Sequence, residues 1–163
     1  MNLLATMTRY KSWADARLLE AVAALTDDEL RSPQPIIFGS ILGTLNHVHA
    51  MDLVWQANLE GRPHGMTTRN PGDSQGLDEL TLTQHEINRW YQQYADNLSS
   101  SAATDAVRFT FIGGEPGKMT REAMLLHVLN HGTYHRGHVA DMLYGMGYQP
   151  PTTDLPVFLR TDR

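Results

Sequence analysis

The chain has 163 residues, a typical length for one domain with one sizeable core, so we expect residues 1–163 to form a single domain. Its 13 lysines and arginines against 18 acidic residues give a formal net charge of −5, which argues against nucleic acid as a partner. The sequence contains no run of about 18 apolar residues, and its first residues lack the pattern of a secretory signal. We therefore expect a cytoplasmic protein with no membrane contact.

The chain contains no cysteine. This excludes disulfide bonds, a thiolate nucleophile within the protein and every zinc site built from sulfur. No nucleophile elbow, phosphate-binding loop or paired-carboxylate motif occurs either. A bound metal would have to be held by nitrogen and oxygen, so the eight histidines are the first candidates for ligands.

Two amphipathic helices are predicted in the first part of the chain. Apolar residues recur every three or four positions from Leu3 to Leu25, which is the period of one buried helix face. The stretch 31–40 then contains two prolines and a glycine, which interrupt helical hydrogen bonding. Ser40 can cap a second helix that ends near Leu59.

A long connection precedes the next helix. Residues 61–81 are rich in Gly, Pro, Asn, Asp and Thr and are predicted to form a crossover or lid-like loop. Thr83 followed by Glu86 is typical of a capping box at the start of a third helix, which runs to about Leu98. The stretch SSSAAT should end this helix.

A hairpin and a fourth helix are predicted next. Residues 106–120 alternate apolar and polar side chains and turn through GGEPG, which favours a short β-hairpin. Thr120 can cap a helix that extends to about Tyr144, where GMGYQPP stops it. The expected fold is all-α: a four-helix bundle with a long connection between helices two and three and a short hairpin before helix four.

Four histidines share one stripe of the fourth helix. At about 100° per residue, His127, His131, His135 and His138 lie within about 80° of one another. Imidazoles four residues apart can converge on one metal ion. A lone histidine is more often a satisfied polar residue than a ligand. Several histidines buried together, however, lack enough hydrogen-bond acceptors, and a shared cation removes that difficulty.

A third ligand is expected from another helix. His47 and His49 are the candidates, and they point about 200° apart, so only one of them can face the bundle. Periodicity does not decide between the two. His64 in the long loop and His85 at the start of the third helix are expected to face solvent.

The segments GSILGTLNHVHAMDLVW and HVLNHGTYHRGHVADML form a two-part histidine motif. This motif resembles that of the DinB family of damage-inducible proteins, and the resemblance spans nearly the whole chain. The family belongs to a DinB/YfiT-like superfamily of metal-binding four-helix bundles and is unrelated to the DNA polymerase of the same name. The resemblance implies that His47, His131 and His135 bind a divalent metal ion, with zinc and nickel as the first candidates.

The motif departs from the family pattern at its end. Family members often have a histidine in place of Tyr134 and a glutamine in place of His138, so His138 could replace or supplement a ligand. Arg136 lies about 100° from His135 and is expected to make a helix or subunit contact. Three carboxylates are candidate hydrogen-bond partners of the ligands, and the sequence does not choose among them: Asp15, Asp52 and Asp141.

Three neutral imidazoles leave a fourth position for water or a small-molecule substrate, as in catalytic rather than structural zinc sites. The superfamily includes thiol transferases and isomerases that use bacillithiol, mycothiol or glutathione. The resemblance therefore implies a metal-dependent enzyme that transfers a low-molecular-weight thiol to an electrophile in stress or detoxification. The alternatives are hydrolysis by bound water and a non-catalytic metal-binding stress-response protein. The family resemblance also implies a homodimer. The sequence does not indicate any catalytic residue apart from the metal ligands.

Overall fold

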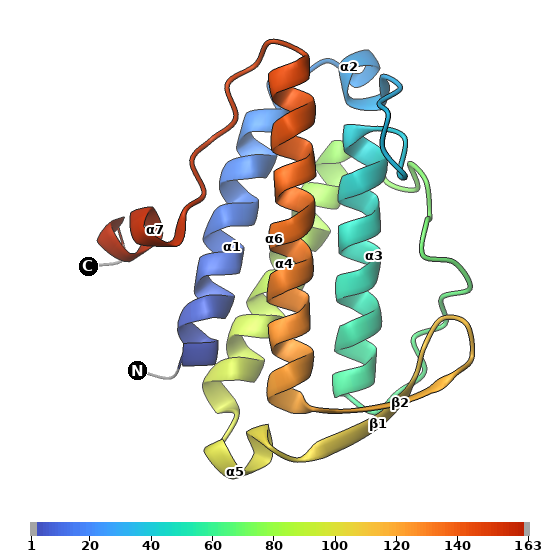
Figure 1. The fold of residues 1–163 in the computed structure, drawn as a ribbon, viewed down its shortest axis with the longest axis vertical. Coiled ribbons are helices and arrows are strands. Elements are labelled where there is room, and N and C mark those ends of the chain that lie inside the picture. Colours follow the sequence, from blue (N-terminus) through green and yellow to red (C-terminus); the bar gives the residue numbers. More distant parts are fainter. Residues whose placement is uncertain (1–2, 162–163) are drawn as a thin grey trace.

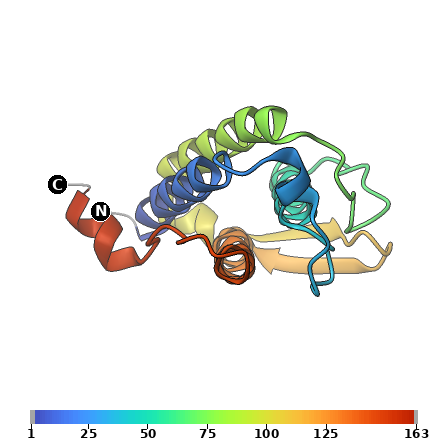
Figure 2. The same cartoon turned by 90° about the horizontal axis from the view of Figure 1, so that it is seen from above.

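The computed structural model describes residues 3–161, and four long helices dominate it (Figure 1). These helices are α1 (Leu3–Val22), α3 (Ile41–Leu59), α4 (Leu77–Asn97) and α6 (Arg121–Gly145). Seen from above, they form a ring in the order α1, α4, α3, α6, and each packs against the next (Figure 2). The four-helix bundle expected from the sequence is confirmed.

Besides the four long helices, residues 3–161 form a β-hairpin and three short helices, joined by loops. Strands β1 (Ala106–Thr110) and β2 (Pro116–Thr120) pair antiparallel just before α6, which confirms the predicted hairpin. The short helices are α2 (Asp27–Arg31), α5 (Ser100–Ala103) and α7 (Leu155–Thr161). None of the helices in the range 3–161 is long and apolar enough to span a membrane.

The third long helix starts earlier than predicted. α4 begins at Leu77, and its N-cap is Gly76, which has no side chain that could signal the start. Thr83 lies inside the helix, where its hydroxyl donates to the carbonyl of Glu79 one turn back. The predicted capping box of Thr83 and Glu86 is therefore wrong, and the long connection ends before residue 77.

The short helices were not predicted. α1 ends at Val22 rather than Leu25, and Thr26 then starts α2 through a capping box with Glu29. The SSSAAT stretch, predicted only as a break, forms α5 with Ser99 as its N-cap. α7 follows the stop after α6, and Phe158 packs it against Tyr10 of α1 at a ring distance of 5.8 Å.

The core contains two large apolar parts and two small apolar clusters. One part lies near the α2 end and contains Leu18, Leu42, Leu80 and Val139, among others. The other lies near the hairpin and contains Trp55, Tyr91, Met124 and Val128, among others. Buried polar side chains from all four long helices lie between them: Lys11, Asp15, Asp52, Gln84, Asn88 and Arg136.

Lys11 is the centre of this polar layer. Its side chain is only 1% exposed, and its Nζ donates to Asp15 at 2.8 Å, to Asp52 at 2.7 Å and to Asn88 at 2.8 Å. Burial alone would lower the pKa of Lys11, but the two carboxylates outweigh burial and raise it. Arg136 of α6 donates to the second oxygen of Asp15 at 3.0 Å. The layer therefore joins α1, α3, α4 and α6 through paired charges.

Replacing Lys11 by methionine should destabilise the protein by about 3–5 kcal/mol, because Asp52 would stay buried without its cation. Urea denaturation measures this change. Arg9→Met is the matched control: the Arg9–Asp96 pair is exposed, and its loss should cost less than about 1 kcal/mol. Equal losses in the two variants would contradict a buried ionic layer.

Candidate metal centre

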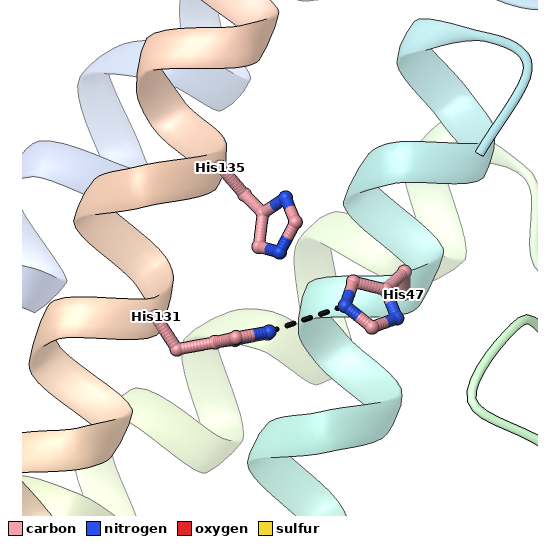
Figure 3. Close-up of side chains that lie close together, drawn as sticks. All are labelled: His47, His131 and His135. Carbon is pink, nitrogen blue, oxygen red and sulfur yellow. Dashed lines mark hydrogen bonds between the residues drawn. The ribbon is translucent and has the colours of Figure 1, made fainter. Parts of the chain in front are cut away.

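The two histidines of α3 face different neighbours. His47 points toward α6, where its Nε2 lies 3.1 Å from Nε2 of His131 (Figure 3). His49 points toward α4, where its Nδ1 lies 3.0 Å from the amide oxygen of Gln84. Both side chains are buried. The structure thus decides the choice that helical periodicity left open, and His47 is the residue that meets the histidines of α6.

His47, His131 and His135 form a group that could hold a metal ion. Each offers one ring nitrogen, and the three nitrogens lie within 4.8 Å of one another. His131 and His135 are one turn apart on α6, with ring centroids 4.5 Å apart, and both point toward α3 (Figure 3). We call these three residues the histidine triad.

Hydrogen bonds orient the triad from outside. Nδ1 of His47 lies 2.6 Å from the carbonyl oxygen of Arg69. A carbonyl only accepts, so Nδ1 carries the proton and Nε2 keeps its lone pair facing the other two rings. Nδ1 of His135 lies 3.3 Å from Nδ1 of His138. Such outer contacts are the usual means of fixing the tautomer and orientation of a metal-ligating imidazole.

Phe38 covers the triad from the segment between α2 and α3. Its ring stacks on His47, with centroids 3.8 Å apart and an angle of 15° between the planes. It also makes an edge contact with His135 at 5.4 Å. The sequence analysis treated this segment only as a connector. Its place in the fold makes it a wall on one side of the triad.

The triad is neutral at pH 7. Burial, assisted by the neighbouring imidazoles, lowers the pKa of His131 to about 3 and that of His135 to about 4. Burial is also the main cause that lowers the pKa of His47, with a smaller contribution from the charge of Arg69. Neutral imidazoles are the form that binds metals. A second proton on His131 or His135 is therefore unfavourable at pH 7, and each ring keeps a lone pair that can bind a metal.

A cavity of about 850 Å³ opens beside His47 and His131. Met51, Val54 and Trp55 of α3 form one wall, and Phe111 and Ile112 after β1 form another. His127 also lines this space, and its ring lies 4.6 Å from that of Trp55. A volume of this size lies within the range of small-molecule sites in proteins.

The other sequence candidates lie outside the triad. His138 contacts His135 but does not join the group, and His127 lies one turn before His131. His64 is tied to the hairpin through the carbonyl of Thr110 at 3.2 Å. His85 is half-buried on α4. None of them completes a second group of metal ligands within residues 3–161.

The predicted role of Arg136 in a helix contact is confirmed, since it is buried and bonded to Asp15 of α1. Of the three candidate carboxylates, Asp15 and Asp52 contact Lys11, and Asp141 is exposed. None of the three accepts a hydrogen bond from a triad ring in the described residues. The groups that contact the triad rings are instead the Arg69 carbonyl, next to His47, and His138, next to His135. No sequence pattern indicated these two contacts.

The metal-free protein should lose stability as the pH falls from about 7 to about 4.5, because unfolded imidazoles take up protons near pH 6.5. His131 and His135 resist protonation in the folded state until about pH 3 and about pH 4. The unfolded state therefore binds more protons in this window. His131→Gln should show a smaller fall than the parent protein or His85→Gln in urea denaturation. An identical pH dependence in all three proteins would contradict the depressed pKa values.

The protein should bind one divalent ion per chain, and His131→Ala should lose most of this binding. Elemental analysis of protein made without a histidine tag or a metal column measures the stoichiometry. His85→Ala is the control, because it removes a histidine that does not face the triad. Retention of one ion per chain in His131→Ala would contradict a site at the triad.

Comparison with known proteins places this architecture in a family. The chain is 24% identical over 159 residues to Protein DinB of Bacillus subtilis (strain 168), an alignment that covers 92% of this chain and 90% of that protein. A DinB-like protein from Bacillus cereus ATCC 10987 has the same fold, with a TM-score of 0.65 at 18% identity. The matched region covers 88% of this chain and 91% of that protein's chain. The sequence model of the DinB family matches residues 1–163. The chain therefore belongs to the DinB family.

Proposed function

We propose that this chain is a divalent-metal-dependent enzyme that transfers a low-molecular-weight thiol to an electrophile in stress or detoxification. The observation that carries the proposal is the triad itself: three neutral imidazoles from α3 and α6 meet at the edge of a cavity large enough for a small molecule. Membership of the DinB family supports a metal at this position.

The donor set fits zinc or nickel, because both accept imidazole nitrogen. In a tetrahedral site with nitrogens about 2.1 Å from the ion, the nitrogens would lie about 3.4 Å from each other. The His47–His131 pair, at 3.1 Å, is already close to this separation. His47, His131 and His135 would hold the ion at the edge of the cavity, which His47 and His131 line.

The absence of cysteine makes the thiol an external one. A divalent ion, when bound, lowers the pKa of a thiol or water that coordinates it and so supplies a nucleophile at neutral pH. In the transfer, the thiol loses its proton to solvent water, its sulfur forms a bond to the electrophilic carbon, and the leaving group departs with its electron pair. Atoms and charge then balance without an oxidant or reductant.

The chain's own residues orient and shield these reactants. The Arg69 carbonyl keeps the proton of His47 on Nδ1, away from the shared centre. Phe38 covers His47 on one side. The apolar wall that includes Met51 and Trp55 offers a surface for the body of the electrophile and displaces water from it.

Turnover of a chlorodinitrobenzene with glutathione, bacillithiol or mycothiol tests the proposal. Zinc- or nickel-loaded protein should accelerate the reaction with at least one thiol, and His131→Ala should lower the rate about 100-fold or more, while His85→Ala keeps it. Turnover of a test ester without any thiol would favour hydrolysis instead. Bound metal with no turnover, together with a large loss of thermal stability on chelation, would favour a non-catalytic metal-binding role.

A further inference from the structure

The cavity beside the triad is lined by a positive charge, although the whole chain is negatively charged. The chain as a whole carries five more acidic than basic residues. Among residues 3–161, those that line the cavity nevertheless include no aspartate or glutamate, and the one formally charged residue among them is Arg69. Seven of the other lining residues are apolar or aromatic, and the rest are polar, histidine or glycine; the seven are Ile37, Phe38, Met51, Val54, Trp55, Phe111 and Ile112.

Arg69 is held in place by its backbone. The carbonyl of Arg69 accepts the hydrogen bond from His47, and Asn70 N donates to the Thr68 hydroxyl at 3.1 Å. Further along the segment, Ser74 and Gln75 both donate to Asn46 of α3, at 2.9 and 3.0 Å. The loop is thus attached to α3 at two successive residues, one of which is a member of the triad.

The Arg69 guanidinium is available for a ligand. Five other arginines in residues 3–161 are paired with acids, for example Arg31 with Asp73 and Arg121 with Asp105, whereas Arg17, Arg89, Arg108 and Arg160, like Arg69, are not. Among residues 3–161, no carboxylate lies within ion-pair distance of the Arg69 side chain. A guanidinium is suited to a carboxylate, because its parallel N–H groups match the two carboxylate oxygens.

The positive character extends beyond the cavity. A second hollow of about 440 Å³ shares Asn58 with it. Arg62 and Arg108 line this hollow, and no acidic side chain among residues 3–161 does; Arg62 is paired with the neighbouring Glu60, so Arg108 supplies the unpaired charge. A lining of one sign of charge raises the local concentration of ligands of the opposite sign, and a bound divalent cation would add to this effect.

We propose that the cavity binds an organic carboxylate with an apolar or aromatic body, and that Arg69 determines this specificity by pairing with the carboxylate. The apolar walls take up the body of the molecule, and the guanidinium takes up its charged end. This inference rests on the proposed function, because it names the class of small molecule on which the triad would act. Arg69 is a specificity-determining residue, distinct from the metal ligands.

Calorimetric titration with 2-naphthoate and its neutral analogue 2-naphthamide tests the proposal. In metal-free protein, where no ion can attract the carboxylate, naphthoate should bind about tenfold more tightly than the amide. Arg69→Ala should abolish this preference, and Arg69→Lys should retain part of it because the charge remains. Arg160→Ala is the matched control, since it removes one exposed arginine from α7, away from the cavity.

Arg69→Ala keeps the backbone carbonyl that bonds to His47, so its thermal stability and metal stoichiometry should equal those of the parent protein. An unchanged preference for naphthoate in Arg69→Ala, or equal binding of the two probes to the parent protein, would overturn the proposal. Turnover assays of Arg69→Ala show which reactant carries the carboxylate. If its KM rises for a carboxylated thiol, Arg69 pairs with the thiol; if its KM rises for a carboxylated electrophile, Arg69 pairs with the electrophile. Arg69-dependent anion binding without thiol-dependent turnover would contradict the proposed function alone.

Discussion

The close approach of two imidazole nitrogens, Nε2 of His47 and Nε2 of His131 at 3.1 Å, is the constraint on which the site depends. Two lone pairs repel at that distance, so a proton or a cation must lie between them. The neutral Nε2–H tautomer of His131 can donate to His47, and because burial keeps the pKa of His131 near 3, a second proton on this ring is costly at pH 7. His135 adds a third nitrogen to the same space. A shared divalent cation would satisfy all three rings at once.

The bundle could be predicted because its long helices carry ordinary local signals. Ser40 and Thr120 cap α3 and α6 as expected, with their hydroxyls accepting from backbone N–H groups in the first turn. The start of α4 could not be predicted in this way, because the N-cap Gly76 has no side chain and the first turn is joined to a polar loop. The Thr83 hydroxyl donates to the carbonyl of Glu79, one turn earlier in the helix. Threonine is common both in this position and at the start of a capping box, so its residue type alone did not separate the two.

The triad was only partly accessible to sequence reasoning. α6 has an exposed and a buried side, so its histidine stripe was visible. α3 is buried on almost every side, which leaves periodicity unable to separate His47 from His49, and the choice came from the family resemblance. Burial of Lys11 was not expected, although this residue lies one turn after half-buried Met7 and one turn before Asp15 on α1. Phe38 and Arg69 reach the site from loops, whose path depends on tertiary contacts that no local pattern encodes.

The central claim is that imidazoles from α3 and α6 share one metal ion. Anomalous diffraction at the zinc edge, from crystals of zinc-loaded protein made without an affinity tag, tests it most directly. The account predicts the strongest peak at about 2.0–2.1 Å from one nitrogen each of His47, His131 and His135. Zinc bound elsewhere, with the three rings unchanged and no peak between them, would contradict it.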